Sequence, residues 1–267
     1  MRIVLTIAGS DSIAGAGVQA DLKTFAALGV YGVSAITAIT AQNTTSVAEV
    51  FALSPQAVQS QIEQIARDVE ISAIKTGMLA TRDIVEVVAD TIERLKPGAL
   101  VVDPVMKPTR ESRQTLLAPE AVSILKERLL PIAAVVTPNA GEAAELSGIR
   151  VDSLDTAREA AKRISYMGPT AVVIKGGHLT GSEAVDLLFH AGSFTEFAAP
   201  RLRSSVLHGT GCTFASAIAA RLALGDDIPA AVQRAKTYVT GAIEHSFQIG
   251  GGSRVLNHMW AGGLYFR

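Results

Sequence analysis

Cysteine is almost absent from this sequence, which contains only Cys212 among its 267 residues. A single cysteine cannot form an intrachain disulfide, and this is typical of proteins in a reducing compartment. It also cannot build a cysteine-rich zinc cluster, and the five histidines show no spacing typical of metal ligands. We therefore expect a cytoplasmic protein that is held together by its core.

Long apolar runs and an excess of one charge are also missing. No stretch approaches the roughly 20 apolar residues that span a bilayer. The apolar run at 3–8 is too short for a signal peptide and is soon followed by Asp11. The 24 basic residues balance 25 acidic ones, without a long basic run. We therefore expect neither a membrane nor a nucleic-acid partner, and an anionic ligand would be held by a few placed groups.

Apolar residues make up 48% of the sequence and charged residues 18%, which is typical of a chain with a large core. Short β-branched runs alternate with helical patterns. Strands are predicted at residues 3–8, 32–38, 73–75, 100–102, 134–137 and 171–175. Helices are predicted at residues 18–28, 55–67, 82–95, 120–130, 140–146 and 156–167. The alternation predicts an α/β fold, with a mostly parallel sheet between two helix layers.

The last third of the sequence has a different pattern. Residues 185–190 and 192–198 predict a hairpin at a sheet edge, and two Ala-rich helices follow at 213–224 and 229–246. Neither a repeat nor a low-complexity linker interrupts the chain, so we expect one domain over 1–267. In such a fold ligands bind beyond the carboxyl ends of the strands, and the loops there carry the functional prediction.

The segment His208-Gly209-Thr210-Gly211-Cys212 leads directly into a predicted helix. Two glycines and a helix N-terminus favour a backbone cradle for a phosphoryl group in transfer. A Walker A loop would need Lys-Ser or Lys-Thr after the second glycine, and Cys-Thr stands there instead. At this position Cys212 is expected to have a lowered thiol pKa and to accept a substrate proton, although a buried packing role is also open.

A second glycine pattern, at residues 15–20, matches the dinucleotide fingerprint G-x-G-x-x-A. That fingerprint needs its glycines immediately after the strand and an acid about 20 residues later. Here six residues separate the strand from Gly15, and the next strand leads to Gln42. A glycine-rich loop close to a small ligand fits better. Asp21 follows in the first helix, where it either reaches the pocket or is an ordinary solvated residue.

Two further loops offer groups for a flat ring. Gln42 has one acceptor and two donors for the edge of a heterocycle, although a turn-forming glutamine would look the same. Met78 follows the third strand and either covers a ring or packs in the core.

The remaining loops offer groups for magnesium and phosphate. Asp103 ends a strand before a proline, which favours a magnesium or phosphate site. Asn139 and Glu142 have the spacing of a capping box, which would also place Glu142 to hold magnesium through water. Lys175 precedes two glycines and either contacts phosphate or is solvated.

Together these segments resemble the ribokinase-like superfamily, and within it the hydroxymethylpyrimidine/phosphomethylpyrimidine kinases of thiamine biosynthesis. The resemblance covers nearly the whole chain in eight ordered segments: AGSD (8–11), GAGVQADLKTF (15–25), TAQNT (40–44), GML (77–79), DPVM (103–106), TPN (137–139), KGGH (175–178) and HGTGCT (208–213). It implies a three-layer α/β/α ribokinase-like fold and a homodimer that uses ATP and Mg²⁺. The implied reaction phosphorylates 4-amino-5-hydroxymethyl-2-methylpyrimidine and then its monophosphate.

The resemblance also implies a role for each matching residue. Asp21 and Gln42 would hydrogen-bond the aminopyrimidine. Met78 and Val105 would flank its ring, with Gly9 beside it. Asp103 and Glu142 would organise magnesium and the phosphates. The implied catalytic groups are Lys175, Gly209, Thr210, Gly211 and Cys212, and the ATP phosphates would meet Asp103, Asn139, Lys175, Gly209 and Gly211.

The sequence departs from the family pattern in four places: Ile13-Ala14, 107–112, 205–207 and 253–255. The segment 107–112 corresponds to a mobile flap in the family, so its contacts are open. A pyridoxal kinase of the same subgroup is the nearest alternative, but those relatives typically have Met-Asp-Pro where Gln42-Asn43 stands. A vitamer-binding protein without catalysis and a dinucleotide-dependent oxidoreductase are more distant alternatives.

Overall fold

The computed structural model describes residues 1–106, 116–178, 183–201 and 207–262. Its strands are β1 (Ile3–Asp11), β2 (Tyr31–Gln42), β3 (Val47–Ala52), β4 (Ala73–Thr76), β5 (Leu100–Val102), β6 (Val135–Val136), β7 (Ala171–Ile174), β8 (Glu183–His190), β9 (Ser193–Pro200), β10 (Leu207–His208) and β11 (Arg254–Val255). Its α-helices are α1 (Gly17–Ala27), α2 (Pro55–Asp68), α3 (Arg82–Leu95), α4 (Pro119–Ile124), α5 (Ala140–Ser147), α6 (Leu154–Ser165), α7 (Thr210–Ala223) and α8 (Ile228–Glu244).

Within the described residues, nine strands form one sheet in the order β3-β2-β1-β4-β5-β6-β7-β8-β9. The neighbours from β2 to β7 pair in parallel, whereas β3, β8 and β9 pair antiparallel. The central strands β4 to β7 are buried on both faces, which explains their continuous β-branched sequences. The predicted mostly parallel sheet is confirmed.

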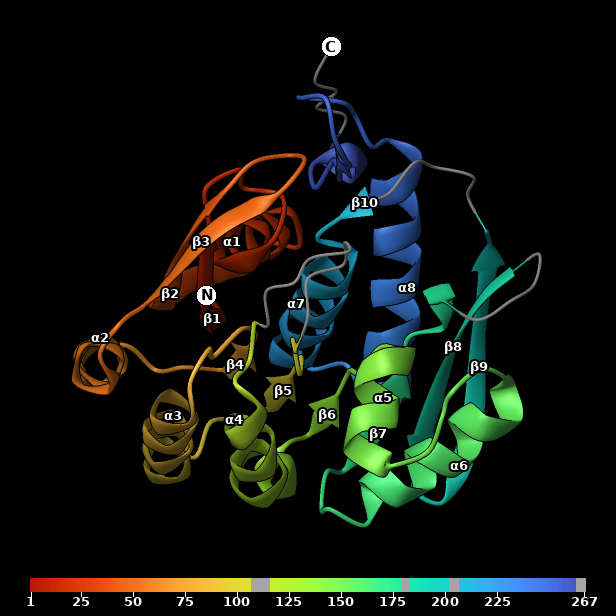
Figure 1. Ribbon diagram of the computed structural model, residues 1–267, viewed down its shortest axis with the longest axis horizontal. Helices are drawn as coiled ribbons and strands as arrows, with labels where there is room; N and C mark the ends of the chain where they lie inside the picture. Colours follow the sequence, from red (N-terminus) through yellow and green to blue (C-terminus); the bar gives the residue numbers. More distant parts are fainter. Residues whose placement is uncertain (107–115, 179–182, 202–206, 263–267) are drawn as a thin grey trace.

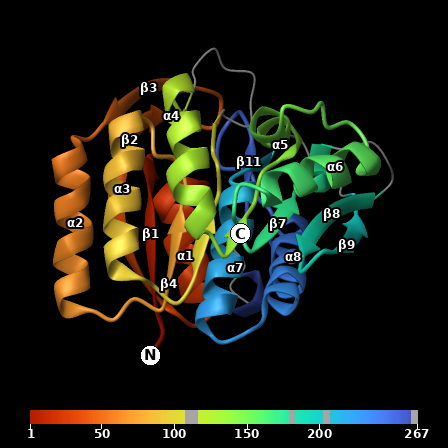
Figure 2. The same ribbon diagram turned by 90° about the horizontal axis from the view of Figure 1, so that it is seen from below.

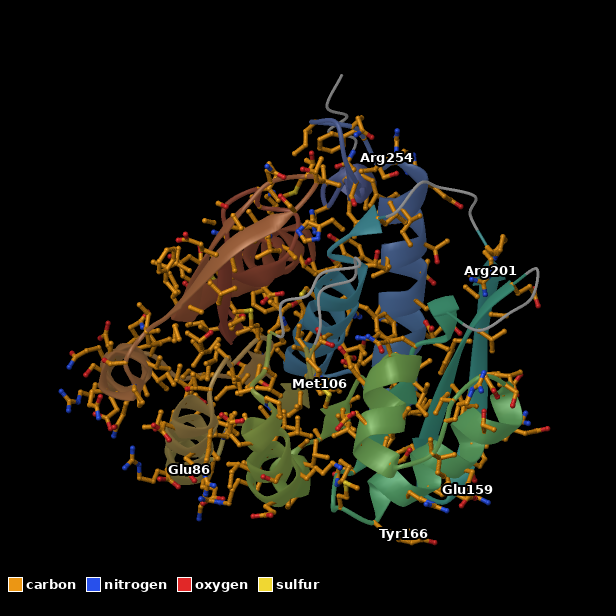
Figure 3. The ribbon with its side chains drawn as sticks, viewed as in Figure 1. Glu86, Met106, Glu159, Tyr166, Arg201 and Arg254 are labelled. Atoms are coloured by element: carbon orange, nitrogen blue, oxygen red, sulfur yellow. The ribbon has the colours of Figure 1, made fainter. Side chains whose placement is uncertain are left out.

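Helices cover both faces of this sheet (Figures 1 and 2). Helices α2 to α6 enclose one core, which contains Ile84 and Leu129. Helices α1, α7 and α8 enclose the other, which contains Phe25, Ile218 and Tyr238. Polar side chains occupy the outer sides of the helices, as Figure 3 shows for Glu86 and Glu159. The two cores confirm the three-layer α/β/α architecture.

Most predicted elements are present, with different lengths. The second strand is twelve residues long and ends at Gln42, so this residue belongs to β2 and not to a loop. The predicted hairpin is β8–β9, with a turn of two positive-φ residues, Ala191 and Gly192. The predicted helix at 120–130 is α4 continued by a π-helical segment (Leu125–Leu129) and a 3₁₀ segment (Leu130–Ile132).

Three strands, β3, β10 and β11, were not predicted from the sequence. The edge strand β3 pairs with β2, and the short strands β10 and β11 pair in parallel as a separate two-stranded sheet. The pairing of β10 with β11 places His208 opposite Val255 and so anchors the glycine segment that leads into α7. Three short 3₁₀ segments complete the described structure: Gly176–His178, Trp260–Gly262 and the one after α4. No helix in the described part of the chain is long and apolar enough to cross a membrane.

Candidate active site

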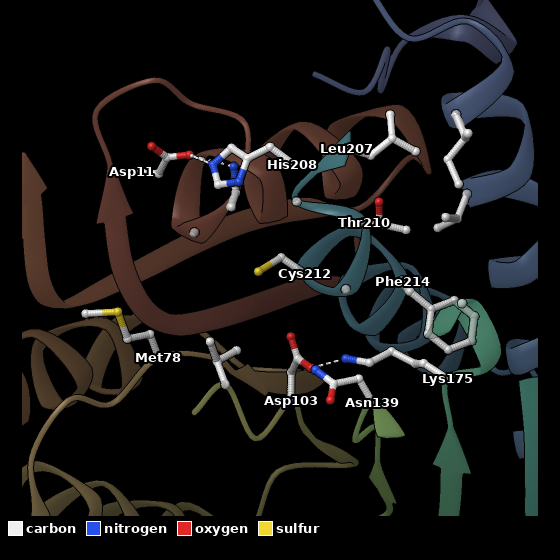
Figure 4. Close-up of a pocket in the computed structure, with 18 of the residues that line it drawn as sticks. Asp11, Met78, Asp103, Asn139, Lys175, Leu207, His208, Thr210, Cys212 and Phe214 are labelled. Carbon is white, nitrogen blue, oxygen red and sulfur yellow. Dashed lines mark hydrogen bonds and ion pairs between the residues drawn. The ribbon is translucent and has the colours of Figure 1, made fainter. Parts of the chain in front are cut away.

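A cavity of about 610 Å³ lies at the carboxyl edge of the parallel strands (Figure 4). One end is formed by the ends of β1 and β2, with Met78 and Val105 beside them. The middle contains the start of α7 together with Asp103 and Lys175. The far end reaches α8 and the end of β9. One cavity therefore joins loops that are far apart in the sequence.

Gly209, at the start of α7, must be glycine for steric reasons. Gly209 is the N-cap of α7 with φ of 87°, and a Cβ there would lie 1.8 Å from the carbonyl oxygen of Gly15. A Cβ on Gly211 would lie 3.1 Å from Lys175 Nζ. Residues 209–212 all line the cavity, so the N-terminus of α7 points its backbone into it. The segment has the form of the anion cradle that its sequence suggested.

Lys175 lies between two carboxylates in the middle of the cavity. Its Nζ is 2.8 Å from Asp103 Oδ1 and 3.8 Å from a Glu142 carboxylate oxygen. Burial alone would lower the pKa of Lys175, but Asp103 and Glu142 outweigh that effect and raise it. The ammonium therefore stays charged at neutral pH and can hold an anionic ligand.

Glu142 caps helix α5 and also lines the cavity. Its carboxylate accepts a hydrogen bond from Asn139 N at 2.8 Å, while the Asn139 side chain accepts one from Glu142 N, which completes the expected capping box. Burial is the main cause that raises the pKa of Glu142, Lys175 opposes it and the Asp103 charge adds to it, which gives a pKa of about 7. Asp103, Asn139 and Glu142 all line the cavity.

Cys212 lies near the middle of the cavity, as Figure 4 shows, but its thiol differs from the prediction. Burial raises its pKa to about 11, and the charges of Asp103 and Asp21 add to the effect. Lys75 acts in the opposite direction but is outweighed. The expectation of a lowered pKa was wrong, because the sequence revealed the helix N-terminus and not the burial or the neighbouring carboxylates.

The predicted ring-binding residues come together at the other end. Gly9, Gln42, Met78 and Val105 all line the cavity. Gly9 lies at a register shift in the β1–β2 pairing, and a Cβ there would lie 3.4 Å from Met78 Sδ. Gly9 therefore lets the backbone of β1 lie close to the thioether. The arrangement is compatible with a planar ligand.

Asp21 is the predicted ligand contact that the structure does not bring to the cavity. It is fully buried, is absent from the cavity lining and accepts four hydrogen bonds. Lys75 Nζ donates two of them, at 3.0 and 2.9 Å, and Thr6 and Ser216 donate one each at 2.6 Å. Both oxygens of the carboxylate therefore have partners inside the protein. Its helix position alone could not reveal those partners.

Asp11 and His208 belong to segments that the sequence analysis singled out, but neither was given a role of its own, and both line the cavity. His208 Nε2 lies 2.8 Å from Asp11 Oδ2, and Figure 4 shows the two side chains facing each other. The Gln42 side-chain amide donates to Asp11 Oδ1. Asp11 is the last residue of β1, so attention to acidic residues at strand ends, which singled out Asp103, could have found it.

The apolar far end was also missed. It contains Leu207, Phe214, Val239 and Ile243. Lys236 borders it and is held 2.9 Å from Asp186. The sequence signal was only an apolar helix face, which is indistinguishable from a core-facing one. The predicted flap at 107–112 and residues 205–206 of the altered 205–207 segment lie outside the described residues.

Within the described residues, no group of three or more His, Cys, Asp or Glu side chains could hold a metal by itself. Asp103 and Glu142 nevertheless provide two carboxylates beside the cavity. Mg²⁺ is often bound through one or two carboxylates, with waters and substrate phosphates completing its shell. The donor set therefore fits a nucleotide-bound magnesium.

Comparison with known proteins identifies the family. The profile of the phosphomethylpyrimidine kinase family matches residues 11–257. A hydroxymethylpyrimidine/phosphomethylpyrimidine kinase from Streptomyces coelicolor is 47% identical, over 97% of this chain and 95% of that protein. The thiamine biosynthesis bifunctional protein of Geobacter sulfurreducens is 45% identical, over 97% of this chain but only 52% of its own length. The chain thus spans about half of that bifunctional relative.

Solved structures agree with this assignment. The phosphomethylpyrimidine kinase from Clostridium difficile has a TM-score of 0.80 and 43% identity, and the match covers 91% of this chain and all of that one. The Bacillus subtilis pyridoxal kinase, solved as an ADP complex, has a TM-score of 0.91 and 38% identity, with 99% and 100% covered. From its sequence and its fold, the chain belongs to the phosphomethylpyrimidine kinase family of ribokinase-like phosphotransferases.

Proposed function

We propose that this chain transfers the γ-phosphoryl group of ATP to the hydroxymethyl group of 4-amino-5-hydroxymethyl-2-methylpyrimidine. A second transfer then extends the monophosphate to the diphosphate. The observation that carries this proposal is the single cavity, which joins a ring-sized end, a phosphate cradle with Lys175 and an apolar far end. The relatives named hydroxymethylpyrimidine/phosphomethylpyrimidine kinase support the choice of acceptor.

The acceptor ring lies between Met78 and Val105 in this proposal. Gln42 contacts its polar edge, and Gly9 leaves the space beside it. The lining of the cavity by these four residues supports this placement. Positioning the hydroxymethyl group near the start of α7 supplies much of the rate, since phosphoryl transfer depends mainly on alignment and charge stabilisation.

The nucleotide occupies the other side of the cradle. Its base packs against the apolar far end, where Phe214, Val239 and Ile243 offer a surface. Its phosphates meet Lys175, Asn139 and the backbone of residues 209–212. Asp103 and Glu142 would hold Mg²⁺, which supplies positive charge to the phosphate oxygens when bound. Solved relatives in complex with ADP and AMP-PCP support the use of a nucleotide.

The residues of the cradle stabilise the phosphoryl group during transfer. Backbone N–H groups at the α7 N-terminus and the Lys175 ammonium face its developing charge. Cys212 is the candidate acceptor of the hydroxyl proton. Because its pKa is raised to about 11, the thiol is mostly protonated at pH 7, and only its small thiolate fraction can take the hydroxyl proton, forming an S–H bond as the O–H bond breaks.

A coupled assay of ATP consumption tests the proposal with three acceptors: the pyrimidine alcohol, its monophosphate and pyridoxal. We expect turnover with both pyrimidines and a higher kcat/KM for the pyrimidine alcohol than for pyridoxal. A clear preference for pyridoxal would overturn the acceptor, and pyrimidine binding without ATP turnover would overturn the reaction.

Pyridoxal phosphorylation is the second candidate, and a specific observation favours it. The solved relatives from Bacillus subtilis and Staphylococcus aureus are pyridoxal kinases with TM-scores of 0.91 and 0.90. Their identities of 38% and 37% are lower than the 47% of the Streptomyces relative. The pyrimidine therefore remains the first choice.

We further propose that residues 1–267 form one kinase domain that works as a cytoplasmic homodimer. The shared sheet between the two cores supports one domain. Exposed Ile39 and Phe51 lie opposite each other on β2 and β3 and offer an apolar contact for a second copy. Light scattering after size-exclusion chromatography measures the assembly, and a monomer would contradict it.

A further inference from the structure

The side-chain amide of Gln42 is held by a carboxylate, that of Asp11. Its nitrogen donates to Asp11 Oδ1, and the same nitrogen lies 3.3 Å from His208 Nε2. His208 Nε2 lies 2.8 Å from the other oxygen, Asp11 Oδ2. Since His208 Nε2 carries the proton that it donates to Asp11, it cannot accept one from Gln42. Asp11 is therefore the acceptor that holds the Gln42 amide.

The backbone around Asp11 fixes its carboxylate in place. Ile13 N donates to Oδ1 at 2.9 Å, and Gly15 N and Ala16 N donate to Oδ2 at 2.9 and 2.7 Å. Together with His208 and Gln42, five donors face these two oxygens. The side chain is 4% exposed, and these donors hold it facing Gln42.

Every contact of Asp11 favours its ionised form. Burial would raise the pKa of Asp11, but hydrogen bonds from His208 and Gln42 and the charge of His208 outweigh it and lower that pKa to about 2. An ionised carboxylate only accepts hydrogen bonds. The Gln42 atom that faces it must therefore be the amide nitrogen and not the carbonyl oxygen.

This assignment leaves the other atom of the amide for the ligand. Gln42 lines the cavity, and none of the described residues donates a hydrogen bond to its carbonyl oxygen. An amide whose nitrogen is held in this way cannot exchange its donor and acceptor by rotation. Gln42 thus presents an acceptor to the cavity.

We propose that Asp11 is a positioning residue that sets ligand specificity, because it holds the Gln42 nitrogen and makes the Gln42 carbonyl select a ring with a donor at the facing edge. The inference rests on the proposed function and deepens it. A 4-aminopyrimidine carries such a donor in its exocyclic amino group. A 4-oxopyrimidine of the same shape places an acceptor there, which would face the Gln42 carbonyl without a proton between them.

The first measurement uses the unaltered protein and three pyrimidine alcohols that carry an amino group, a hydrogen or an oxo group at position 4. We expect kcat/KM to fall in that order, with the amino ring favoured over the oxo ring by at least about 10²-fold. An oxo ring that is turned over as well as the amino ring would overturn the inference. This comparison does not depend on whether a variant folds.

The second measurement uses Asp11→Asn. When the amide oxygen at position 11 takes the place of Oδ2, it keeps the donors of Gly15, Ala16 and His208. Its nitrogen then faces Gln42 and also Ile13 N, which loses its acceptor. Gln42 must turn its oxygen toward that nitrogen and its own nitrogen toward the ligand. We expect the amino-to-oxo ratio of kcat/KM to fall by about tenfold or more, mainly through KM, while an equally lower rate for both rings would indicate a structural role.

A paired exchange and a control complete the design. Adding Gln42→Glu to Asp11→Asn keeps the total charge and restores an acceptor toward the ligand, so the preference for the amino ring should return. Lys23→Gln is the control, because Lys23 binds the carbonyl oxygen of Ala14 in the same loop at 2.9 Å without touching Gln42. Its ratio should match that of the unaltered protein.

The experiments distinguish an error in the proposed function from an error in the inference about Asp11. If the unaltered protein turns over no 4-aminopyrimidine, the proposed function is wrong. If it turns over that ring with a preference that Asp11→Asn leaves unchanged, the function stands and the inference about Asp11 is wrong.

Discussion

Two of the lysine–aspartate pairs at the sheet differ in whether their carboxylate lines the cavity: Asp103 does and Asp21 does not. Lys75 and Asp21 are joined at 2.9 Å, and neither side chain is exposed. Lys175 and Asp103 are joined at 2.8 Å, with 15% of the Lys175 side chain exposed to the cavity. The chemical composition of the two pairs is the same. Their difference lies in what surrounds each carboxylate.

Asp21 is fully satisfied by the protein, whereas Asp103 is not. Both oxygens of Asp21 have donors from Lys75, Thr6 and Ser216. The described donors to the Asp103 carboxylate, Lys175 and Thr137, both reach Oδ1. Its Oδ2 lies 4.0 Å from the place that a Cβ on Gly211 would take, beside the phosphate cradle. A closed pair therefore supports the scaffold, and an open pair is available for chemistry.

The largest expected effect concerns the closed pair. Lys75→Met leaves the Asp21 charge buried without its cation, so we expect the free energy of unfolding to fall by about 3–5 kcal/mol. Urea denaturation measures it. Lys126→Met, on the surface, should change stability by less than about 0.5 kcal/mol. Adding Asp21→Asn to Lys75→Met should recover part of the loss, and a stable Lys75→Met protein would contradict the assigned role.

For the Lys175–Asp103 pair we expect a large effect on catalysis and a smaller one on stability. Lys175→Met removes a cation that faces the phosphoryl group, so we expect kcat to fall by about 10²–10³-fold. Its loss of stability should be smaller than that of Lys75→Met, because Asp103 lines the cavity whereas Asp21 does not. Steady-state kinetics beside urea denaturation separates the two effects. A Lys175→Met protein that unfolds readily but keeps its kcat would show that this pair is structural as well.

The sequence carried enough information for the architecture but not for this distinction. Parallel strands such as β5 and β7 are buried on both faces, and their apolar runs predicted them. The strands β10 and β11 contain two residues each and pair across a long sequence separation, so no local pattern reveals them. The sequence could not show that the partners of Asp21 lie inside the protein, because one of them, Ser216, is 195 residues away. The thiol pKa of Cys212 was missed for a similar reason, since burial arises only in the folded chain.

Cys212 offers a smaller but sharper test of the open region. The thiolate fraction increases about tenfold per pH unit below a pKa of about 11. If this thiol accepts the proton, kcat rises with pH between 7 and 9, and Cys212→Ala both removes that rise and lowers kcat by about 10²-fold. Pyrimidine affinity should change far less than kcat. A rate that hardly changes in Cys212→Ala would assign the catalysis to the backbone cradle.

Gln42 should show the smallest effect, because it contacts one edge of the ligand. We expect Gln42→Met to weaken pyrimidine binding by about 1–3 kcal/mol, since a buried polar group of the ligand loses its partner. Calorimetry measures the affinity. The control is Gln59→Met, the same change on α2, where Gln59 contacts Glu63. Equal affinities for the two variants would rule out the Gln42 contact.

The central claim is that one cavity, with its open Lys175–Asp103 pair, carries out both phosphoryl transfers. Phosphorus NMR of the unaltered protein with MgATP and 4-amino-5-hydroxymethyl-2-methylpyrimidine tests this most directly. The account predicts that a pyrimidine monophosphate signal appears first and is then replaced by a diphosphate as ATP is consumed. An unchanged ATP spectrum, with the pyrimidine bound, would contradict it.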